Sequence, residues 1–298
     1  AVTGSDGKTT TTTIIAELLK AAGKSVYVGG NIGRPLLPEV GDMEPEDVAV
    51  LELSSFQLMT MAQSPQIAVV TNLSPNHLDV HKSMEEYIQA KRNIFVHQGP
   101  EGRVVLNADN EITRTFAGEA PGSVTLFSRQ TPLNQGVFVD GALEEAAIWV
   151  SDGGGRRRVL PLVDILLPGT HNIENYMAAI AAVNGMVPDP VIRKFAKSFA
   201  GVEHRIELVR TLDGVRYYND SIASSPSRTI AGLRSFRQKV ILIAGGYDKH
   251  IPFDDLGPEI IAHVKALFLT GDTAPKLRAA VENAPGYCPK GLPIVEYE

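Results

Sequence analysis

The chain begins Ala1-Val2-Thr3-Gly4-Ser5-Asp6-Gly7-Lys8-Thr9-Thr10 and continues into a helical pattern over residues 11–22. In such a stretch two glycines allow a tight turn whose N–H groups converge on one anion. The lysine reaches phosphate oxygens, and a threonine hydroxyl can bind Mg²⁺. The stretch therefore predicts a phosphate loop and a protein that uses ATP or GTP. The predicted nucleotide-binding residues are Gly4, Ser5, Asp6, Gly7, Lys8, Thr9 and Thr10.

The spacing of this loop is shorter than the common G-x-x-x-x-G-K-[ST] pattern, because Val2 stands where the first glycine would be. The chain instead matches G-x-x-G-K-T-T. Only residues 1–3 precede Gly4, whereas an average strand has about five residues. We therefore expect the numbering to start inside a larger protein.

Composition restricts the class of partner. The 298 residues are 44% hydrophobic, which suits one or two domains, and their formal charge is −6. We do not expect so acidic a chain to bind nucleic acid or an anionic membrane. One cysteine, Cys288, allows no internal disulfide and suits a reducing compartment such as the cytoplasm. No apolar run is long enough for membrane insertion, and we expect a monomer with small-molecule substrates.

Apolar runs alternate with helical periodicity over residues 1–200. This alternation is typical of parallel strands with crossover helices, so we predict a doubly wound, mostly parallel α/β sheet. Between about residues 124 and 167, short alternating runs with Gly and Asp turns predict a small antiparallel β appendage. We expect strands at 47–51, 67–71 and 103–106, and helices at 83–96 and 171–185.

The alternation restarts near Gly201 and predicts a second, Rossmann-like α/β domain over residues 201–298. Its first two strands flank an Asp213-Gly214 turn, and a helix opens at Ser225-Pro226. No helix follows the last strand-like run, so we expect this domain to be incomplete.

Polar residues follow the predicted strands, at the sheet edge where doubly wound proteins bind ligands. Glu52 directly follows one strand and could hold Mg²⁺ beside the phosphate loop, although a solvated strand-end carboxylate would have the same pattern. His77, Asp79 and His81 follow the next strand, and their spacing could form a metal site. A nearby proline is equally compatible with a turn, so we select His77 alone as a ligand or substrate contact.

Lys91 occupies an unusual place in the helix predicted after the capping-box residues Ser83 and Glu86. The spacing of the apolar side chains predicts a leucine at position 91. The lysine stem could pack in the core while its ammonium reaches solvent. Alternatively, burial could lower the pKa of the amine, which could then capture CO₂ as a carbamate and bind a second Mg²⁺.

Other polar residues are compatible with a nucleotide cleft. Asn172 and Asn175 lie three residues apart in the first turn of a helix, where they could contact a purine or cap the helix. Arg205 follows the domain junction, Asp220 a strand end, and Lys249 a glycine pair. We expect them to line a cleft between the two α/β domains.

Taken together, these motifs resemble the Mur ligase family of ATP-dependent, amide-forming enzymes of peptidoglycan synthesis. The resemblance covers nearly the whole chain, and the run from Glu52 to Leu58 with Gly30-Asn31-Ile32-Gly33 is similar to the D-glutamate-adding branch. It implies ATP, two Mg²⁺ ions, UDP-muramoyl-L-alanine and D-glutamate as the small molecules bound. The motifs that carry the resemblance are residues 3–10, 30–33, 52–58, 76–79, 90–91, 167–172, 204–205 and 219–221.

The resemblance also implies a role for individual residues. Thr9 and Glu52 correspond to ligands of the first Mg²⁺, and His77 and a carbamylated Lys91 to ligands of the second. Lys8 and Arg205 correspond to groups that act on the phosphates during catalysis. The implied adenine contacts are Asn172 and Asn175, the ribose contact is Asp220, and the substrate contacts are Asn31, Ser54, Ser55, Ser224 and Lys249.

Some features depart from the family pattern. We expect the domain that binds the uridine nucleotide and the end of the last domain to lie outside residues 1–298, and Ile222 stands where many members have lysine. We therefore expect residues 1–298 alone to bind Mg-ATP but to turn over poorly. Alternatives are another Mur-type ligase, folylpolyglutamate synthase, a P-loop ATPase switch and a non-catalytic nucleotide-binding remnant.

Overall fold

The computed structural model describes residues 1–33, 35–74, 83–223, 225–248 and 251–297. The chain divides into two compact units, Ala1–Phe199 and Ala200–Glu298. No helix in the described parts of the chain is both long enough and apolar enough to cross a lipid bilayer.

The first unit is built on one sheet of nine strands in the order β2-β3-β1-β4-β5-β6-β7-β8-β9. Neighbouring strands from β2 to β7 are parallel, which confirms the predicted fold class. The short β1 lies between β3 and β4. The strands are β1 (Val2–Thr3), β2 (Val26–Gly30), β3 (Val48–Glu52), β4 (Ile67–Val70), β5 (Arg103–Asn107), β6 (Ser123–Ser128), β7 (Gly136–Asp140), β8 (Ala147–Ser151) and β9 (Arg156–Pro161).

The predicted antiparallel appendage is present, but it is not separate from the main sheet. The antiparallel pairs are β7 with β8 and β8 with β9. Residues 124–127 were expected in the appendage, and this was wrong: they belong to β6, which pairs in parallel with β5. Short alternating runs look alike in both kinds of strand, because strand direction depends on a partner distant in sequence.

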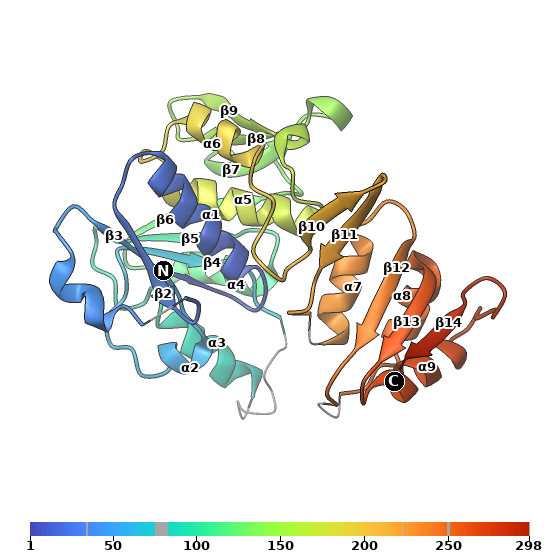
Figure 1. The fold of residues 1–298 in the computed structure, drawn as a ribbon. Helices are drawn as coiled ribbons and strands as arrows, with labels where there is room; N and C mark the ends of the chain where they lie inside the picture. Colours follow the sequence, from blue (N-terminus) through green and yellow to red (C-terminus); the bar gives the residue numbers. More distant parts are fainter. Residues whose placement is uncertain (34, 75–82, 224, 249–250, 298) are drawn as a thin grey trace. The chain divides into compact units, whose positions relative to one another are not determined.

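Helices cover both faces of this sheet (Figure 1). One core contains buried side chains of α1 and α5, which lie side by side, and the other contains side chains of α2, α3 and η2. The helices are α1 (Lys8–Ala21), α2 (Ser55–Leu58), α3 (Met84–Arg92), α4 (Glu111–Thr115), α5 (Thr170–Val183) and α6 (Asp189–Ala196). The 3-10 turns are η1 (Leu37–Asp42), η2 (Phe116–Gly118), η3 (Leu143–Glu145) and η4 (Leu162–Asp164).

The helix that carries Lys91 is shorter than predicted. The Ser83 hydroxyl caps α3 by accepting a hydrogen bond from the Glu86 N–H at 3.2 Å. The helix ends at Arg92, and tighter turns such as that from Ile94 N–H to the Lys91 carbonyl follow it. These turns still place Ile94 and Phe95 in the core, so the apolar pattern continued beyond the helix itself.

The second unit has a hairpin, β10 with β11, and a parallel sheet in the order β12-β13-β14. The Asp213-Gly214 turn joins β10 to β11, and Pro226 opens α7 with Ser225 at the N-cap, as predicted. The apolar core of this unit includes side chains of α7, α8 and α9. The elements are β10 (Glu207–Leu212), β11 (Val215–Asn219), α7 (Pro226–Arg234), β12 (Val240–Gly245), α8 (Leu256–His263), β13 (Val264–Thr270), α9 (Ala274–Glu282) and β14 (Ile294–Tyr297).

The continuity of the nine-stranded sheet can be tested in β8. Ile148 is fully buried there, and its truncation to alanine should cost about 2–5 kcal/mol of unfolding free energy. Because β8 belongs to the same sheet as β4, we expect the single tryptophan, Trp149, and the backbone amide of Val69 to report the same destabilisation. Tryptophan fluorescence in urea and amide hydrogen exchange would measure the two changes.

The control is Val163→Ala, which shortens a side chain that is 66% exposed, and should change the stability by less than about 0.5 kcal/mol. Loss of the Trp149 signal at lower urea with unchanged protection of Val69 would contradict a continuous cooperative sheet.

Candidate active site at the phosphate loop

The candidate site lies at the carboxyl ends of β1, β3 and β4. In the sheet Val2 pairs with Glu52, and Thr3 pairs with Val70, so the loop after β1 meets the ends of both neighbouring strands. Helix α3 brings Lys91 to the same edge, where it experiences the charges of Lys8, Glu52 and Asp6. Of the polar residues expected at this edge, Glu52 lies beside the loop, as ligand sites in such sheets require.

The phosphate loop is a tight turn at the start of α1. Gly7 is the N-cap residue and has a left-handed backbone with φ 78°, which glycine adopts without strain. The first N–H groups of α1 point out of the helix towards the loop, as in an anion site. The Lys8 ammonium lies over its own loop and donates to the carbonyls of Gly4 and Ser5 at 2.9 Å each.

Lys91 is buried in the core beside this loop and is only 2% exposed. Its amine therefore does not reach solvent, and of the two interpretations of Lys91 the solvent-seeking one is wrong. Burial, followed by the positive charge of Lys8, lowers the Lys91 pKa from 10.5 to about 7, although Glu52 and Asp6 act in the opposite direction. The neutral amine is therefore accessible to Lys91 near neutral pH, where an exposed lysine is protonated.

Two residues that the sequence did not indicate hold the Lys91 amine. The amine donates to the Thr3 hydroxyl at 3.1 Å, and this hydroxyl donates in turn to the Leu53 carbonyl at 2.7 Å. The Tyr87 ring lies one helical turn before Lys91, with its centroid 4.9 Å from Nζ. The Tyr87 hydroxyl is 3.0 Å from the Ser5 hydroxyl, which links α3 to the phosphate loop.

Glu52 is the second buried charged residue of the site and is 1% exposed, so it is not a solvated strand end. The Asn31 amide donates to Glu52 Oε1 at 2.9 Å. The other oxygen, Oε2, is buried without a hydrogen-bond donor among the described residues. A buried carboxylate oxygen of this kind suits a cation, because its negative charge is otherwise poorly compensated.

Asn172 and Asn175 are buried against the phosphate loop. The Thr11 hydroxyl donates to Asn175 Oδ1 at 3.2 Å, Asn175 Nδ2 donates to Asn172 Oδ1 at 3.1 Å, and Asn172 Nδ2 donates to the Pro168 carbonyl at 2.7 Å. Asn175 is so close to Gly7 that a Cβ on this glycine would lie 2.3 Å from Asn175 Oδ1. These amides hold α1 and α5 together, and their role as adenine contacts stays a prediction.

The second unit contains Arg205 and Asp220. Burial raises the pKa of the Asp220 carboxyl, while the Ile206 N–H, which donates to Asp220 Oδ1 at 3.0 Å, lowers it. The positive charge of Arg205 also lowers the pKa of this carboxyl. His204 and Ile206 on either side of Arg205 have φ values of 65° and 43°, an uncommon backbone for residues with side chains. Sequence reasoning did not indicate this strained turn.

Several predicted site residues cannot be placed, because His77, Asp79, His81, Ser224 and Lys249 lie outside the described residues. Among the residues that are described, no cluster of three or more His, Cys, Asp or Glu side chains could hold a metal. Ser54 caps the short helix α2 by accepting from the Gln57 N–H, and Ser55 is buried. Their predicted contact with substrate stays a prediction.

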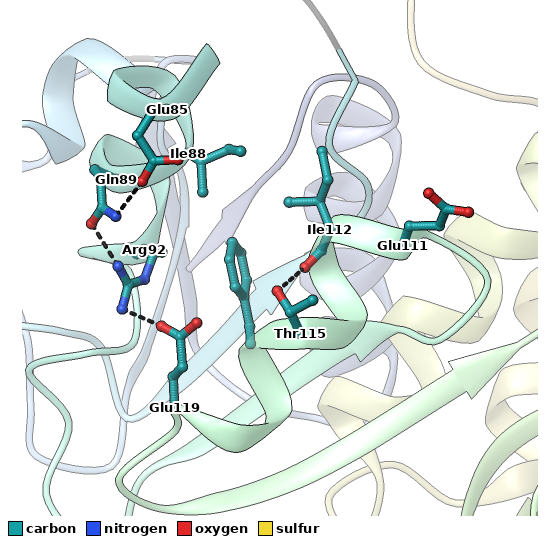
Figure 2. A pocket seen from close by; sticks show the side chains of 9 residues that line it. Glu85, Ile88, Gln89, Arg92, Glu111, Ile112, Thr115 and Glu119 are labelled. Atoms are coloured by element: carbon teal, nitrogen blue, oxygen red, sulfur yellow. Dashed lines mark hydrogen bonds and ion pairs between the residues drawn. The ribbon is translucent and has the colours of Figure 1, made fainter. Parts of the chain in front are cut away.

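A surface pocket of about 360 Å³ lies between α3 and the α4–η2 segment (Figure 2). A chain of polar contacts crosses its wall from Glu85 through Gln89 and Arg92 to Glu119. This pocket uses other residues of α3 than Tyr87 and Lys91, which are buried, so it is distinct from the candidate site.

The fold and the site define a class of protein. The Mur ligase middle domain matches residues 2–183, and the Mur ligase glutamate ligase domain matches residues 204–296. The first match alone covers more than half of the chain, which therefore belongs to the Mur ligase family.

Curated relatives indicate the particular branch. The chain is 58% identical over 294 residues to UDP-N-acetylmuramoylalanine–D-glutamate ligase from Acetivibrio thermocellus, a match that covers 99% of the chain and 62% of that protein. It is 53% identical over 282 residues to the ligase of the same name from Clostridium beijerinckii, covering 95% of the chain and 60% of the relative. The chain thus spans about three fifths of the length of these relatives.

Solved structures share the fold. MurF from Acinetobacter baumannii superposes with a TM-score of 0.75 at 17% identity, covering 99% of the chain and 66% of that protein. The UDP-N-acetylmuramate–alanine ligase MurC from Thermotoga maritima gives a TM-score of 0.71 at 19% identity, with the same coverage of 99% and 66%.

The lowered pKa of Lys91 predicts a pH-dependent stability. The folded state holds this pKa at about 7, and the unfolded chain restores 10.5, so between these values the unfolded state binds more protons. Folding is therefore disfavoured as the pH falls from 10.5 towards 7, by up to about 1.4 kcal/mol per pH unit. Lys91→Met has no amine at this position. The unfolding free energy of the variant minus that of the wild type should therefore rise as the pH falls from 10.5 to about 7, and should level off at lower pH.

Urea unfolding of both proteins at a series of pH values would measure this difference. Lys24→Met, which removes an exposed lysine, controls for the loss of one positive charge. A stability difference between Lys91→Met and wild type that stays constant from pH 7 to about 10 would contradict a neutral buried amine.

Proposed function

We propose that the protein is an ATP-dependent ligase that adds D-glutamate to UDP-N-acetylmuramoyl-L-alanine through an acyl phosphate. The observation that carries this proposal is the buried amine of Lys91 beside Glu52 and the phosphate loop. A phosphate loop alone would suit many ATPases. A neutral lysine amine and a buried carboxylate at the same edge suit a reaction in which two anions must be brought together.

The phosphate loop binds the phosphates of ATP and neutralises part of their negative charge. The Lys8 ammonium, which lies over the carbonyls of Gly4 and Ser5, can move to the phosphate oxygens when ATP binds. The N–H groups at the start of α1 orient these oxygens. The substrate carboxylate then attacks the γ-phosphorus, the bond to the β-γ bridging oxygen breaks, and ADP leaves.

Thr9 and Glu52 are the proposed ligands of the first Mg²⁺, which when bound neutralises charge on the phosphates. Glu52 supports this assignment with its buried, uncompensated Oε2. Asn31 holds Oε1 and so fixes the orientation of the carboxylate. A direct contact of Asn31 with the muramoyl substrate would have to be made alongside this hydrogen bond.

Lys91 is the proposed site of a carbamate. The neutral amine attacks the carbon of CO₂, a C–N bond forms, and one proton is released, so that a base becomes a carboxylate-like ligand for the second Mg²⁺. The Thr3 hydroxyl donates to Leu53, so it accepts a hydrogen bond from the N–H that the carbamate nitrogen retains. His77 is the other proposed ligand of this ion.

The last step is attack by the amine of D-glutamate on the acyl phosphate, which releases phosphate and leaves an amide. We assign Asn172 and Asn175 to the adenine side, Arg205 to the phosphates and Asp220 to the ribose. Ser54, Ser55, Ser224 and Lys249 are the proposed substrate contacts. The relatives' names support D-glutamate over other acceptor amines. A cytoplasmic role in peptidoglycan synthesis is part of the proposal. A monomeric state remains our expectation.

An acceptor panel tests the function. Phosphate release is measured with the full-length protein, ATP, Mg²⁺, UDP-N-acetylmuramoyl-L-alanine and one amino acid at a time. We expect release with D-glutamate, little with L-glutamate, L-lysine or meso-diaminopimelate, and loss of at least about 100-fold in Lys8→Ala, because the transferred phosphoryl loses its cation. Release with L-lysine or meso-diaminopimelate but not with D-glutamate would assign the protein to another branch, and release without any muramoyl substrate would indicate a simple ATPase.

The carbamate has a test that does not depend on activity. Carbon-13 bicarbonate should give one carbamate resonance in the wild type and none in Lys91→Ala. Lys20→Ala, which removes an exposed lysine of α1, is the control and should keep the resonance. The signal should weaken as the pH falls below about 7, because the amine is then protonated. A spectrum without this resonance at saturating bicarbonate would remove the carbamate from the mechanism.

A further inference from the structure

Two consecutive residues after β4, Thr71 and Asn72, hold the backbone of the phosphate loop. The Asn72 side chain contacts both polar groups of the Asp6 backbone: Oδ1 accepts from its N–H at 2.9 Å, and Nδ2 donates to its carbonyl at 3.2 Å. The Ser5 N–H donates to the Asn72 carbonyl at 2.9 Å. The Thr71 hydroxyl adds a 2.6 Å hydrogen bond to the Asp6 carbonyl and a longer one, at 3.3 Å, to the carbonyl of Thr3.

We propose that Thr71 and Asn72 are positioning residues that set the shape of the phosphate loop, and we call this pair the loop clamp. The proposal rests on the proposed function in that it takes the loop to bind the phosphates of ATP. The hydrogen bonds link residues more than 60 positions apart, and an amide side chain that engages both groups of one peptide residue fixes its orientation.

The clamp explains the first glycine of the loop. A Cβ on Gly4 would lie 2.0 Å from the Thr71 hydroxyl oxygen and 3.1 Å from the Asn72 carbonyl oxygen. The backbone φ of Gly4, 148°, is also one that other residues rarely adopt. Glycine at position 4 therefore makes room for the clamp, in addition to any room that it makes for phosphate.

The clamp also divides the N–H groups of the loop into two sets. Those of Ser5 and Asp6 already donate to Asn72. A phosphate that binds the loop therefore accepts hydrogen bonds from the N–H groups of residues 7–10, at the start of α1. This refines the sequence-based prediction, which assigned every residue from Gly4 to Thr10 to the nucleotide.

The test removes the clamp and measures both the loop and the ligand. Asn72→Ala and Thr71→Val are compared with wild type in the full-length protein, with residue-resolved amide exchange by NMR. Without nucleotide, we expect exchange of the Asp6 amide to rise at least about tenfold in Asn72→Ala, because its side-chain acceptor is lost, whereas the Ser5 N–H keeps its acceptor, the backbone carbonyl of residue 72. The Kd for Mg-ATP should rise about tenfold or more, while that for adenosine stays unchanged.

Asn110→Ala is the matched control. The Asn110 amide donates to the Leu73 carbonyl, next to the clamp, at 2.9 Å, and its Oδ1 caps α4, but it does not contact the loop. It should lower stability without changing the exchange of Ser5 and Asp6 or the Kd for Mg-ATP. Thr71→Val removes the hydroxyl that donates to the Asp6 carbonyl and should raise the Kd for Mg-ATP. Thr71→Ser keeps the hydroxyl and should bind Mg-ATP with the wild-type Kd.

Two results would overturn the clamp: unchanged exchange of Asp6 in Asn72→Ala, or a wild-type loop in which Mg-ATP strongly changes the exchange of Ser5 and Asp6 but not that of residues 7–10. Failure of the wild type to bind Mg-ATP would instead overturn the proposed function, and the exchange measured without nucleotide would still decide on the clamp. If Asn72→Ala does not fold, Thr71→Val and Thr71→Ser compare the loop without and with the hydroxyl that donates to the Asp6 carbonyl, and an Mg-ATP Kd that is equal in the two variants would overturn the clamp.

Discussion

The burial of one lysine amine beside the charge of another sets the conditions for the rest of the site. Transfer of an ammonium from water to a protein core is costly, and Lys8 increases the cost for Lys91. Two effects reduce this cost. The amine can lose its proton near neutral pH, and it contacts the Thr3 hydroxyl and the Tyr87 ring. A buried amine with a lowered pKa is therefore a consequence of where α3 packs.

The neighbouring groups follow from the same arrangement. Parallel pairing of β1 with β3 and β4 places Glu52 and the Thr71-Asn72 pair on either side of the loop. Asn175 closes the loop from α5. Each of these side chains lies in a strand or helix of the first unit or directly after one. Their positions therefore depend on the elements that form the hydrophobic core.

Much of this could be predicted from the sequence, because the relevant patterns are local. The loop spacing, the strand-end position of Glu52 and the apolar period that made position 91 a core site are all visible within a few residues. The partners of these groups could not be predicted. The contact of Lys91 with Thr3 spans 88 positions, and that of Asn72 with Asp6 spans 66. The direction of β6 likewise depends on its pairing with β5, which short alternating runs do not encode.

The close approaches of glycine to polar groups have a consequence for how this sequence can change over evolution. At Gly4 the obstacle is the Thr71 hydroxyl, at Gly7 the Asn175 amide and at Gly30 the Glu52 carbonyl. A side chain at any of these glycines would meet a neighbouring group and would also require a positive φ. A smaller residue at position 71 or 175 would remove the steric clash but would leave the unfavourable φ. Gly4, Gly7 and Gly30 are therefore expected to change only when both the neighbouring group and the local backbone conformation change.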